Sequence, residues 1–432
     1  MGLSPGEGRL EGMDGPDARP HRPTDPDLAG FDELIHRPVP GPVAAVYEGA
    51  ASTIESISLI QTTWRPGRQL TVRYRVSGSG GSLAGPNDIV AVLGRIPEGA
   101  TVVEGPDSRV GLWVVPNDPL LPGLRSALDV PIVNRLLSDL GSQDQAESAH
   151  LRAYRPGRRA VVEVKAGRSS IFLKVVPSSE VDQLHDKHRS LAGSLPVPDS
   201  LGVAPDLGVV VMRALAGQDL RSVLRAGIEP IPDAATLARM VEDLPAPPSE
   251  WEARSPRSSL TYVASLLGRL LPTESDRLQN LVEAVGSERH EGRVPVHGDF
   301  HEAQVLTRGE RPMGLIDVDT YGWGRPGDDA ATMLAHLHLL APGCANPGQV
   351  MELARSLNIY WDAMFDHADL RLKTAAVALG LATGPFRVNR PNWEQETRER
   401  IGVAEQWVRS AERIDERSLI ATSGRSYEGP AT

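Results

Sequence analysis

One stretch of the sequence constrains this chain more than any other. Residues 297–304 read HGDFHEAQ, and residues 314–319, at the end of an apolar run, read GLIDVD. The carboxylates of Asp299 and Asp317 and the amide of Gln304 are the oxygen groups that suit a divalent cation and an attacking hydroxyl. The pattern therefore predicts a phosphoryl-transfer site.

The spacing of these groups suggests how they meet. Asp299 lies on the loop after the strand-like residues 294–296, where it can act as the base for an acceptor hydroxyl. Residues 305–307 and 313–316 are typical of a hairpin, which would bring Asp317 back beside Gln304. We expect Gln304 and Asp317 to bind Mg²⁺, Asp319 to join its outer shell, and ATP to supply the phosphate.

Two histidines in the same stretch are further catalytic candidates. His297 precedes Gly298, and His301 follows Asp299 by two positions, so either could position the base or the acceptor. A lone histidine next to a strand more often satisfies buried hydrogen bonds than takes part in chemistry. For both residues a role in bracing the loop stays open.

Lys174 is the second indication of a nucleotide site. It lies within IFLKVV at 171–176, with apolar residues on both sides. A buried ammonium is costly unless it meets anions, and the α- and β-phosphates of ATP would supply them. The alternative, a lysine on an edge strand that reaches solvent, is the weaker interpretation because its neighbours are apolar.

Together these motifs resemble the aminoglycoside phosphotransferase and choline kinase superfamily, which shares the protein-kinase-like fold. The resemblance covers about residues 150–415, and its signature extends through Gly324 to the DDA at 328–330. It implies that Asp299 is the catalytic base, that Asp317 is the main magnesium ligand and that Gln304 is the second one. Asp329 would stabilise the loop by accepting hydrogen bonds from backbone amides.

One position departs from most of this superfamily. Gln304 stands where asparagine is usual, and the maltokinase-like branch is similar to this chain in using glutamine there. That branch phosphorylates sugars, so the resemblance implies a sugar hydroxyl as acceptor. His301 also falls where that branch has histidine.

Other parts of the nucleotide site follow from the same resemblance. The family often pairs its lysine with a glutamate on the next helix, for which we prefer Glu180 over Asp182 and Asp186. No G-x-G-x-x-G lies upstream, and RPGR at 155–158 takes its place between the first two strands. There the Gly157 amide could face phosphate with charge from Arg155 or Arg158, or the arginines could simply be solvated. Backbone groups of the adenine-contacting hinge would come from Met212, Arg213, Ala214 and Leu215.

The acceptor pocket should be lined by the helical C-terminal region. Aromatic rings form stacking faces for sugars and cations, although core packing is the commoner role for any one of them. The candidates are Tyr321, Trp323, Arg387 and Trp393.

A faint internal repeat runs through the β-rich part of the chain. WRPGR at 64–68 and YRPGR at 154–158 each precede two β-rich segments. A duplication and two unrelated hairpins are both compatible with this pattern. If the chain is duplicated, only the second copy carries a lysine in its last strand, so the first copy would be structural.

These patterns predict an α+β chain with a kinase-like two-lobed fold and an additional N-terminal β-rich domain. Residues 1–30, rich in Gly, Pro, Asp and Arg, should form a disordered tail. The further divisions are a β-rich extension at 31–150, a β-rich lobe at 151–215, a helical lobe at 216–415 and a flexible tail at 416–432.

Composition narrows the possible partners. A formal net charge of −11 argues against sequence-independent binding to nucleic acid. No apolar run approaches the length of a bilayer and no basic-then-apolar segment opens the chain, so we expect neither a membrane span nor export. The single cysteine, Cys344, fits the reducing cytoplasm. The expected partner is a small hydroxylated molecule, and the sequence does not indicate an oligomeric state.

Two competing hypotheses remain open at this point. A metallophosphoesterase could use His297, Asp299, His301, Asp317 and Asp319 to hold two metals, although it leaves Lys174 unexplained. A pseudokinase that binds nucleotide without turnover is motivated by Gln304, the missing glycine-rich loop and the unclear glutamate. The identity of the acceptor does not follow from the sequence, because specificity resides in loops.

Overall fold

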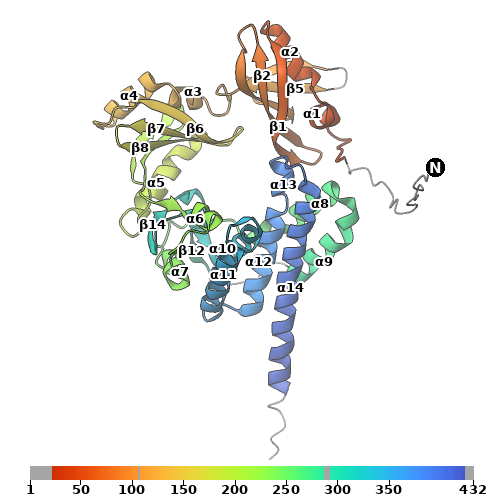
Figure 1. Cartoon of the computed structure of the whole chain (residues 1–432), viewed down its shortest axis with the longest axis vertical. Helices are drawn as coiled ribbons and strands as arrows, with labels where there is room; N and C mark the ends of the chain where they lie inside the picture. The colour runs from red at the N-terminus through yellow and green to blue at the C-terminus, as the bar shows by residue number, and fades with distance from the viewer. Residues whose placement is uncertain (1–21, 106–107, 287–291, 424–432) are drawn as a thin grey trace, which may run out of the picture.

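The computed structural model describes residues 22–105, 108–286 and 292–423, with side chains up to residue 414. Its shape is three-part (Figure 1): an N-terminal sheet, a second sheet beside it, and a body of helices below both. The expected α+β fold with two lobes and an additional N-terminal β-rich part is confirmed. Within the described residues, no helix combines the length and apolar character needed to cross a membrane.

The two large sheets have the same topology. Both are fully antiparallel and five-stranded, with the fourth and fifth strands exchanged in space, so the orders are β1-β2-β3-β5-β4 and β6-β7-β8-β10-β9. Sheet A consists of β1 (Thr53–Arg65), β2 (Gln69–Ser79), β3 (Gly85–Gly94), β4 (Thr101–Glu104) and β5 (Arg109–Val114). Sheet B consists of β6 (Ser148–Arg155), β7 (Arg159–Ala166), β8 (Ser169–Val175), β9 (Ser200–Ala204) and β10 (Val209–Arg213).

Each large sheet is preceded by two short helices and by a matching polar clasp. Oδ2 of Asp25 accepts hydrogen bonds from Trp64 Nε1 and the Gly67 amide, both at 2.8 Å. In the second copy, Oδ2 of Asp118 accepts from Tyr154 OH and the Gly157 amide, both at 2.7 Å. The aspartates open DPDLAGF at 25–31 and DPLLPGL at 118–124. Matching contacts on matching topologies favour duplication over two unrelated hairpins.

The third strand of sheet A is buried on both faces, which explains its continuous apolar run. Alternate residues of a strand point to opposite faces. On β3, Ile89, Ala91 and Leu93 belong to the core shared with the helical body, whereas Val90 and Val92 pack into the core of sheet B. At roughly 1.5–3 kcal/mol for each large apolar side chain that is fully buried, Val90 and Val92 of this strand help to hold the N-terminal sheet against sheet B.

The ordered N-terminal part begins earlier than the predicted tail would allow. Asp25 and Leu28 are buried, and the described chain is already structured from residue 22. The low apolar content of this segment hid its role, because Asp25 is held by polar contacts to a distant turn. Residues 1–21 of the expected tail lie outside the described part.

Helices make up most of the second lobe and flank the sheets. The N-terminal ones are α1 (Phe31–His36), α2 (Gly41–Gly49), α3 (Gly123–Ala127) and α4 (Val130–Asp139). Those that follow are α5 (Val181–Leu191), α6 (Leu220–Ala226), α7 (Ala234–Glu242), α8 (Leu260–Leu270), α9 (Ser275–Val285), α10 (Asp328–Leu340), α11 (Pro347–Asp362), α12 (His367–Leu381), α13 (Gly384–Arg387) and α14 (Trp393–Ser423). Helix α14 runs out beyond the helical body (Figure 1) and continues to Ser423, past the start of the tail expected at 416.

Two small sheets carry the chemical motif between the lobes. One joins β12 (Val294–Val296) to β15 (Gly322–Gly324), and the other joins β11 (Gln218–Asp219), β13 (Val305–Arg308) and β14 (Arg311–Leu315). The predicted hairpin of β13 and β14 is therefore present. Its register pairs Val305 with Leu315, and the Ile316 amide donates to the Gln304 carbonyl at 2.9 Å.

Candidate active site

The loop after β12 is shaped by a glycine and a buried histidine. Gly298 has φ +78°, and a Cβ there would lie 2.7 Å from the Thr320 carbonyl oxygen, so only glycine fits without strain. His297 is 1% exposed; its Nε2 lies 3.1 Å from the Ile316 carbonyl and its Nδ1 accepts from the Asp299 amide at 3.3 Å. The prediction that His297 is catalytic is therefore corrected. Its buried ring cannot reach an acceptor and braces the loop instead.

Asp329 holds the same loop from the other side. Its carboxylate accepts hydrogen bonds from the His297 amide at 2.7 Å and the Gly298 amide at 2.9 Å. Burial raises the pKa of this carboxyl to about 7, against the lowering effect of the two backbone donors. The hydrogen bonds implied by the family resemblance are present.

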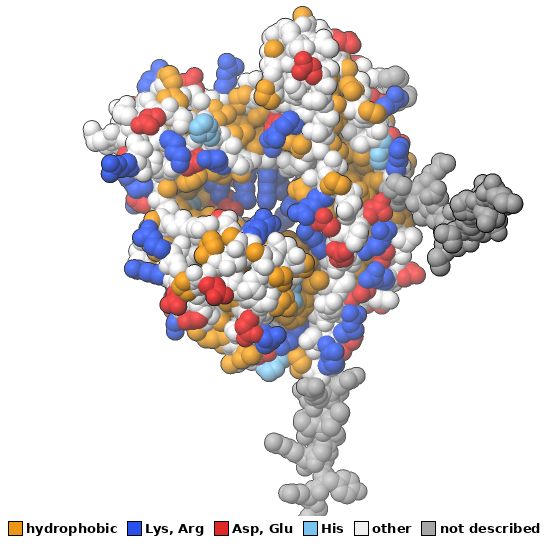
Figure 2. Space-filling view, viewed as in Figure 1, with side chains coloured by type: hydrophobic (Ala, Val, Ile, Leu, Met, Phe, Trp, Pro, Cys, Tyr) orange, Lys and Arg blue, Asp and Glu red, His pale blue; other side chains and the backbone are white. Residues whose placement is uncertain are grey.

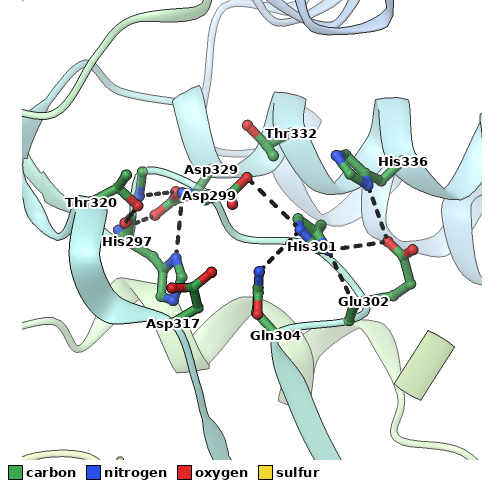
Figure 3. A network of polar contacts seen from close by, with 12 residues as sticks. His297, Asp299, His301, Glu302, Gln304, Asp317, Thr320, Asp329, Thr332 and His336 are labelled. Carbon is green, nitrogen blue, oxygen red and sulfur yellow. Dashed lines mark hydrogen bonds and ion pairs between the residues drawn. The ribbon is translucent and has the colours of Figure 1, made fainter. Parts of the chain in front are cut away.

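Asp299 projects from this braced loop toward His301 (Figure 3). Its side chain is 43% exposed, and Nε2 of His301 lies 3.8 Å from its Oδ1. Desolvation, and then the nearby Asp317 carboxylate, raise its pKa to about 6, although Arg159, Arg155 and Arg221 oppose the shift. A carboxylate with a pKa near 6 is a competent general base at neutral pH.

Lys174 crosses from sheet B to the paired carboxylates of the other lobe. Its Nζ lies 2.6 Å from Oδ1 of Asp317 and also contacts Asp319. Burial would raise the pKa of Asp317, but Lys174 and Arg159 outweigh burial and hold it well below its usual range. Asp317 has φ 59° and ψ 49°, a left-handed conformation that aspartate tolerates better than most residues. Such strain concentrates at functional sites.

Arg159, at the start of β7, belongs to the same cluster and was not predicted. Its guanidinium donates to Asp317 at 3.1 and 3.3 Å and to Asp319 at 2.9 Å. The sequence pattern favoured Arg155 and Arg158 on the turn itself. Arg158 is exposed, while Arg155 lies close enough to Asp317 and Asp299 for their charges to act on its pKa.

The turn of the β6–β7 hairpin corrects a second expectation. We predicted that the Gly157 amide faces a phosphate. In the structure this amide donates to Asp118 at 2.7 Å, so it is not free to do so. The local sequence could not reveal this, because Asp118 lies 39 residues away. What the clasp provides is a fixed turn flanked by Arg155 and Arg159.

Glu180 corrects a third expectation, because it is exposed and Lys174 is bound by Asp317 and Asp319 instead. Helix α5 begins only at Val181, and its buried face presents Lys187. Nζ of Lys187 donates to the Asp319 carbonyl at 2.6 Å and lies 5.6 Å from the Trp251 ring centroid. Helix α5 therefore supports the Asp317–Asp319 segment through a Lys187 side chain that binds the backbone of that segment.

The expected hinge connects the lobes, but two of its amides are already used. Met212 lies in β10, paired with Phe172 of β8. The Arg213 amide donates to the Asp199 carbonyl at 2.9 Å and the Ala214 amide to the Ser170 carbonyl at 3.1 Å. Neither donor is free for a base in this conformation, whereas no hydrogen bond of the Leu215 amide is found within the described residues.

The four residues predicted to line the acceptor pocket differ in burial and in their contacts. Tyr321 is fully buried and its hydroxyl donates to the Pro245 carbonyl at 2.6 Å, so its placement in the pocket is corrected. Trp323 packs against Arg293, and Trp393 packs edge-on against the Phe386 ring at 5.2 Å. Arg387 is exposed at the end of α13. Figure 2 shows basic side chains gathered in a hollow between the lobes.

Three more residues of the site, Arg221, Glu302 and His336, have no counterpart in the sequence prediction, and Figure 3 shows Glu302 and His336 beside His301. Arg221 of α6 donates from Nε to the buried Glu302 at 2.6 Å and from Nη2 reaches His301 and His336 at 3.4 Å each. The rings of His301 and His336 stack with centroids 4.1 Å apart and an interplanar angle of 2°. No local signal marks Arg221 or His336, because they reach the loop from α6 and α10.

Gln304 lies beside His301, with its side-chain amide 3.2 Å from the His301 Nε2. Gln304 is 8% exposed and follows the loop directly into β13. Its backbone carbonyl is joined to the Ile316 amide, so the hairpin brings the segment carrying Asp317 back to this point, as the spacing predicted.

A model of the phosphotransferase enzyme family matches residues 150–364. None of the curated proteins matches the chain. Among solved structures, the chain resembles the macrolide 2′-phosphotransferase MphH from Brachybacterium faecium, with 17% identity, coverage of 62% of this chain and 97% of that chain, and a TM-score of 0.41.

Two other solved structures are similar at the same level. An aminoglycoside phosphotransferase APH(4)-Ia in a ternary complex with ADP and hygromycin B is 16% identical, with coverage of 64% and 98% and a TM-score of 0.44. The GDP complex of aminoglycoside 2′-phosphotransferase-IIIa is 16% identical, with coverage of 63% and 96% and a TM-score of 0.40. The family match includes sheet B, the loop after β12 and the hairpin that leads to Asp317. Through residues 150–364, the chain belongs to the phosphotransferase enzyme family, which has the protein-kinase-like fold.

Proposed function

We propose that the chain is an ATP-dependent kinase that transfers the γ-phosphate to a hydroxyl of a small molecule, a sugar, an amino sugar or an aminoglycoside-like compound. The observation that carries this proposal is the contact of Lys174 with Asp317, at 2.6 Å, across the boundary between the lobes. It gathers a phosphate-binding cation, a carboxylate pair and the Asp299 base at one place, which is what inline phosphoryl transfer requires.

Mg²⁺ fits the donors that the site offers. Asp317 and Asp319 supply carboxylate oxygens and Gln304 supplies an amide, and hard cations prefer such oxygen ligands. Lys174 and Arg159 contact both carboxylates, which shows that this pair attracts positive charge. When bound, Mg²⁺ would neutralise charge on the phosphates.

The chain's own residues then divide the work. Asp299 accepts the proton of the acceptor hydroxyl, and the loop that carries it is fixed by Asp329 and His297. Lys174 and the guanidinium of Arg159 are placed to meet phosphate oxygens, since a fork of donors suits such anions. The hinge after β10 would seat the adenine through backbone groups near Leu215.

The geometry does not favour the metallophosphoesterase. Both ring nitrogens of His297 are engaged by the backbone, by Ile316 and Asp299. Nδ1 of His301 accepts from the Ala303 amide at 3.1 Å. A metal at His297 would have to displace both of its contacts, so this histidine serves the loop better than a dinuclear centre.

The test is a coupled ADP-release screen over sugars, amino sugars, aminoglycosides and other hydroxylated metabolites, with the Asp299→Asn variant as the blank. We expect acceptor-dependent ADP release that requires Mg²⁺ and is lost in the variant. Tight Mg-ATP binding without turnover of any acceptor would support the pseudokinase, and turnover of phosphate monoesters without ATP would support the hydrolase.

A further inference from the structure

Two histidines lie beside the catalytic base Asp299, and one of them, His336, has no role assigned so far. Asp299, His301 and His336 each offer one atom, and these atoms lie within 4.8 Å of one another. His336 comes from α10 and stacks on His301 (Figure 3), so the two imidazoles present parallel edges beside Asp299.

The hydrogen bonds assign the tautomer of His301. Its Nδ1 accepts from the Ala303 amide at 3.1 Å, and the Arg221 guanidinium approaches the same atom at 3.4 Å. Both partners can only donate, so Nδ1 carries no proton. The proton of the neutral ring is then on Nε2, which lies 3.8 Å from Asp299, and the Gln304 side-chain amide, whose nitrogen lies 3.2 Å from the same atom, has to turn its oxygen toward it.

The same argument applies to His336. Nη2 of Arg221 lies 3.4 Å from its Nδ1, whereas Oε2 of Glu302 is 3.7 Å away, too far for a good hydrogen bond. Nδ1 is thus the acceptor and Nε2 carries the proton. Burial, and then the charges of Arg221 and Arg400, lower the pKa of His336 to about 3, which keeps the ring neutral. Within the described residues, Nε2 of His336 has no hydrogen-bond partner.

We propose that His336 is an acceptor-binding residue whose Nε2–H donates to an oxygen of the acceptor adjacent to the hydroxyl that Asp299 activates. This inference rests on the proposed kinase function and narrows its substrate class. Asp299 and His336 each offer an atom, and these atoms lie within 4.8 Å of each other. Hydrogen bonds of about 2.7–3.0 Å from two such groups can reach neighbouring oxygens of one molecule. The acceptor is therefore a polyol of the sugar type.

The same donor discriminates against an amine at that position. An ammonium group has three donors and no lone pair, so it cannot accept from the Nε2–H of His336 or His301. The group next to the reacting hydroxyl is then a hydroxyl or ether oxygen. An amino group is tolerated only elsewhere on the acceptor.

The experiment replaces the donor and keeps the stack. His336→Phe retains an aromatic face toward His301, His336→Gln retains an N–H donor, and His338→Phe, two positions along the same helix, is the matched control. The probes are D-glucose, its monodeoxy derivatives, D-glucosamine and maltose, with Mg-ATP. Initial rates of ADP release give kcat/KM for each acceptor, and the KM for ATP and the melting temperature are measured in parallel.

We expect His336→Phe to lower kcat/KM for the preferred acceptor by about 10- to 100-fold, with the KM for ATP unchanged. The monodeoxy derivative that lacks the oxygen bound by His336 should be a poor substrate for the wild type. The His336→Phe variant should use this derivative no less well than the wild type does. His336→Gln should recover part of the loss, and His338→Phe should show none.

An equal loss on every derivative, or no loss at all, would overturn the role of His336. Failure of the wild-type protein to phosphorylate any of these sugars while it binds Mg-ATP would also overturn this inference, leaving the nucleotide site intact. Failure to bind Mg-ATP would instead overturn the proposed kinase function.

Discussion

The two aspartate clasps provide a matched perturbation, because one substitution can be made in each copy. In each clasp, Oδ2 accepts from an aromatic side chain and a glycine amide, while Oδ1 accepts from the amide two residues on, at 3.2 Å for Asp25 and 2.9 Å for Asp118. An asparagine in place of Asp25 or Asp118 has only one oxygen. At least one donor must then face the NH₂ group, and the remaining bonds lose the charge on their acceptor.

The structure sets the size of the effect. One unsatisfied, largely buried donor costs about 1–3 kcal/mol, and hydrogen bonds to a charged acceptor contribute about 1.5–3 kcal/mol against roughly 1 for neutral ones. We therefore expect both Asp25→Asn and Asp118→Asn to cost about 2–4 kcal/mol in stability. Both aspartates are almost fully buried, at 4% and 2% exposure, so solvent should not repair either loss.

The two variants should differ in nucleotide binding. Only the Asp118 clasp fixes the turn that carries Arg155 and Arg159 toward Asp317. We expect Asp118→Asn to raise the KM for ATP roughly tenfold or more, because small displacements of positioning groups are costly. Asp25→Asn should leave this KM unchanged.

The assay combines urea unfolding midpoints, since a multidomain chain need not unfold in two states, with initial rates of ADP release. Asp27→Asn, at an exposed position in the same segment as Asp25, is the control for both measurements. An ATP effect of equal size in Asp25→Asn would refute the local link between clasp and turn. Unchanged midpoints in both variants would refute the hydrogen-bond argument itself.

Three further outcomes are expected from the site. Asp299→Asn should lower kcat by about 10²–10⁴-fold while Mg-ATP binding, measured by calorimetry, persists; an active variant would remove Asp299 from the role of base. Because the pKa of Asp299 is raised to about 6, its protonated fraction grows as pH falls through 6, so log(kcat/KM) should decline below that pH with a slope near one, and a flat profile down to pH 5 would contradict the assignment. Lys174→Met should raise the KM for ATP by about 10- to 100-fold through the lost charge-assisted contacts, whereas Lys165→Met, on the neighbouring strand with a 47% exposed side chain, should not.

Local patterns in the sequence predicted many of the elements and the loop that carries Asp299. Apolar and β-rich runs predicted most strands of the two large sheets but not β4, β6 or β9, and the hairpin of β13 and β14 followed from turn residues between two β-rich runs. Spacing alone also brought Asp317 back to Gln304, since a tight hairpin fixes which residues end side by side. The WRPGR and YRPGR segments indicated a duplication. The matching topology of the two large sheets was needed to choose duplication over two unrelated hairpins.

Tertiary structure alone decided which groups meet at the site. Lys174 meets Asp317 over a separation of 143 residues, and Arg159 meets Asp319 over 160, so no window of sequence contains both partners. The same holds for the Arg221 contact with His336, 115 residues apart. Glu180 failed as a prediction because its helix starts one residue later and leaves it exposed. Propensity and pattern act over a few residues, whereas the charge pairs of this site depend on how two lobes pack, and that packing is a property of the whole fold.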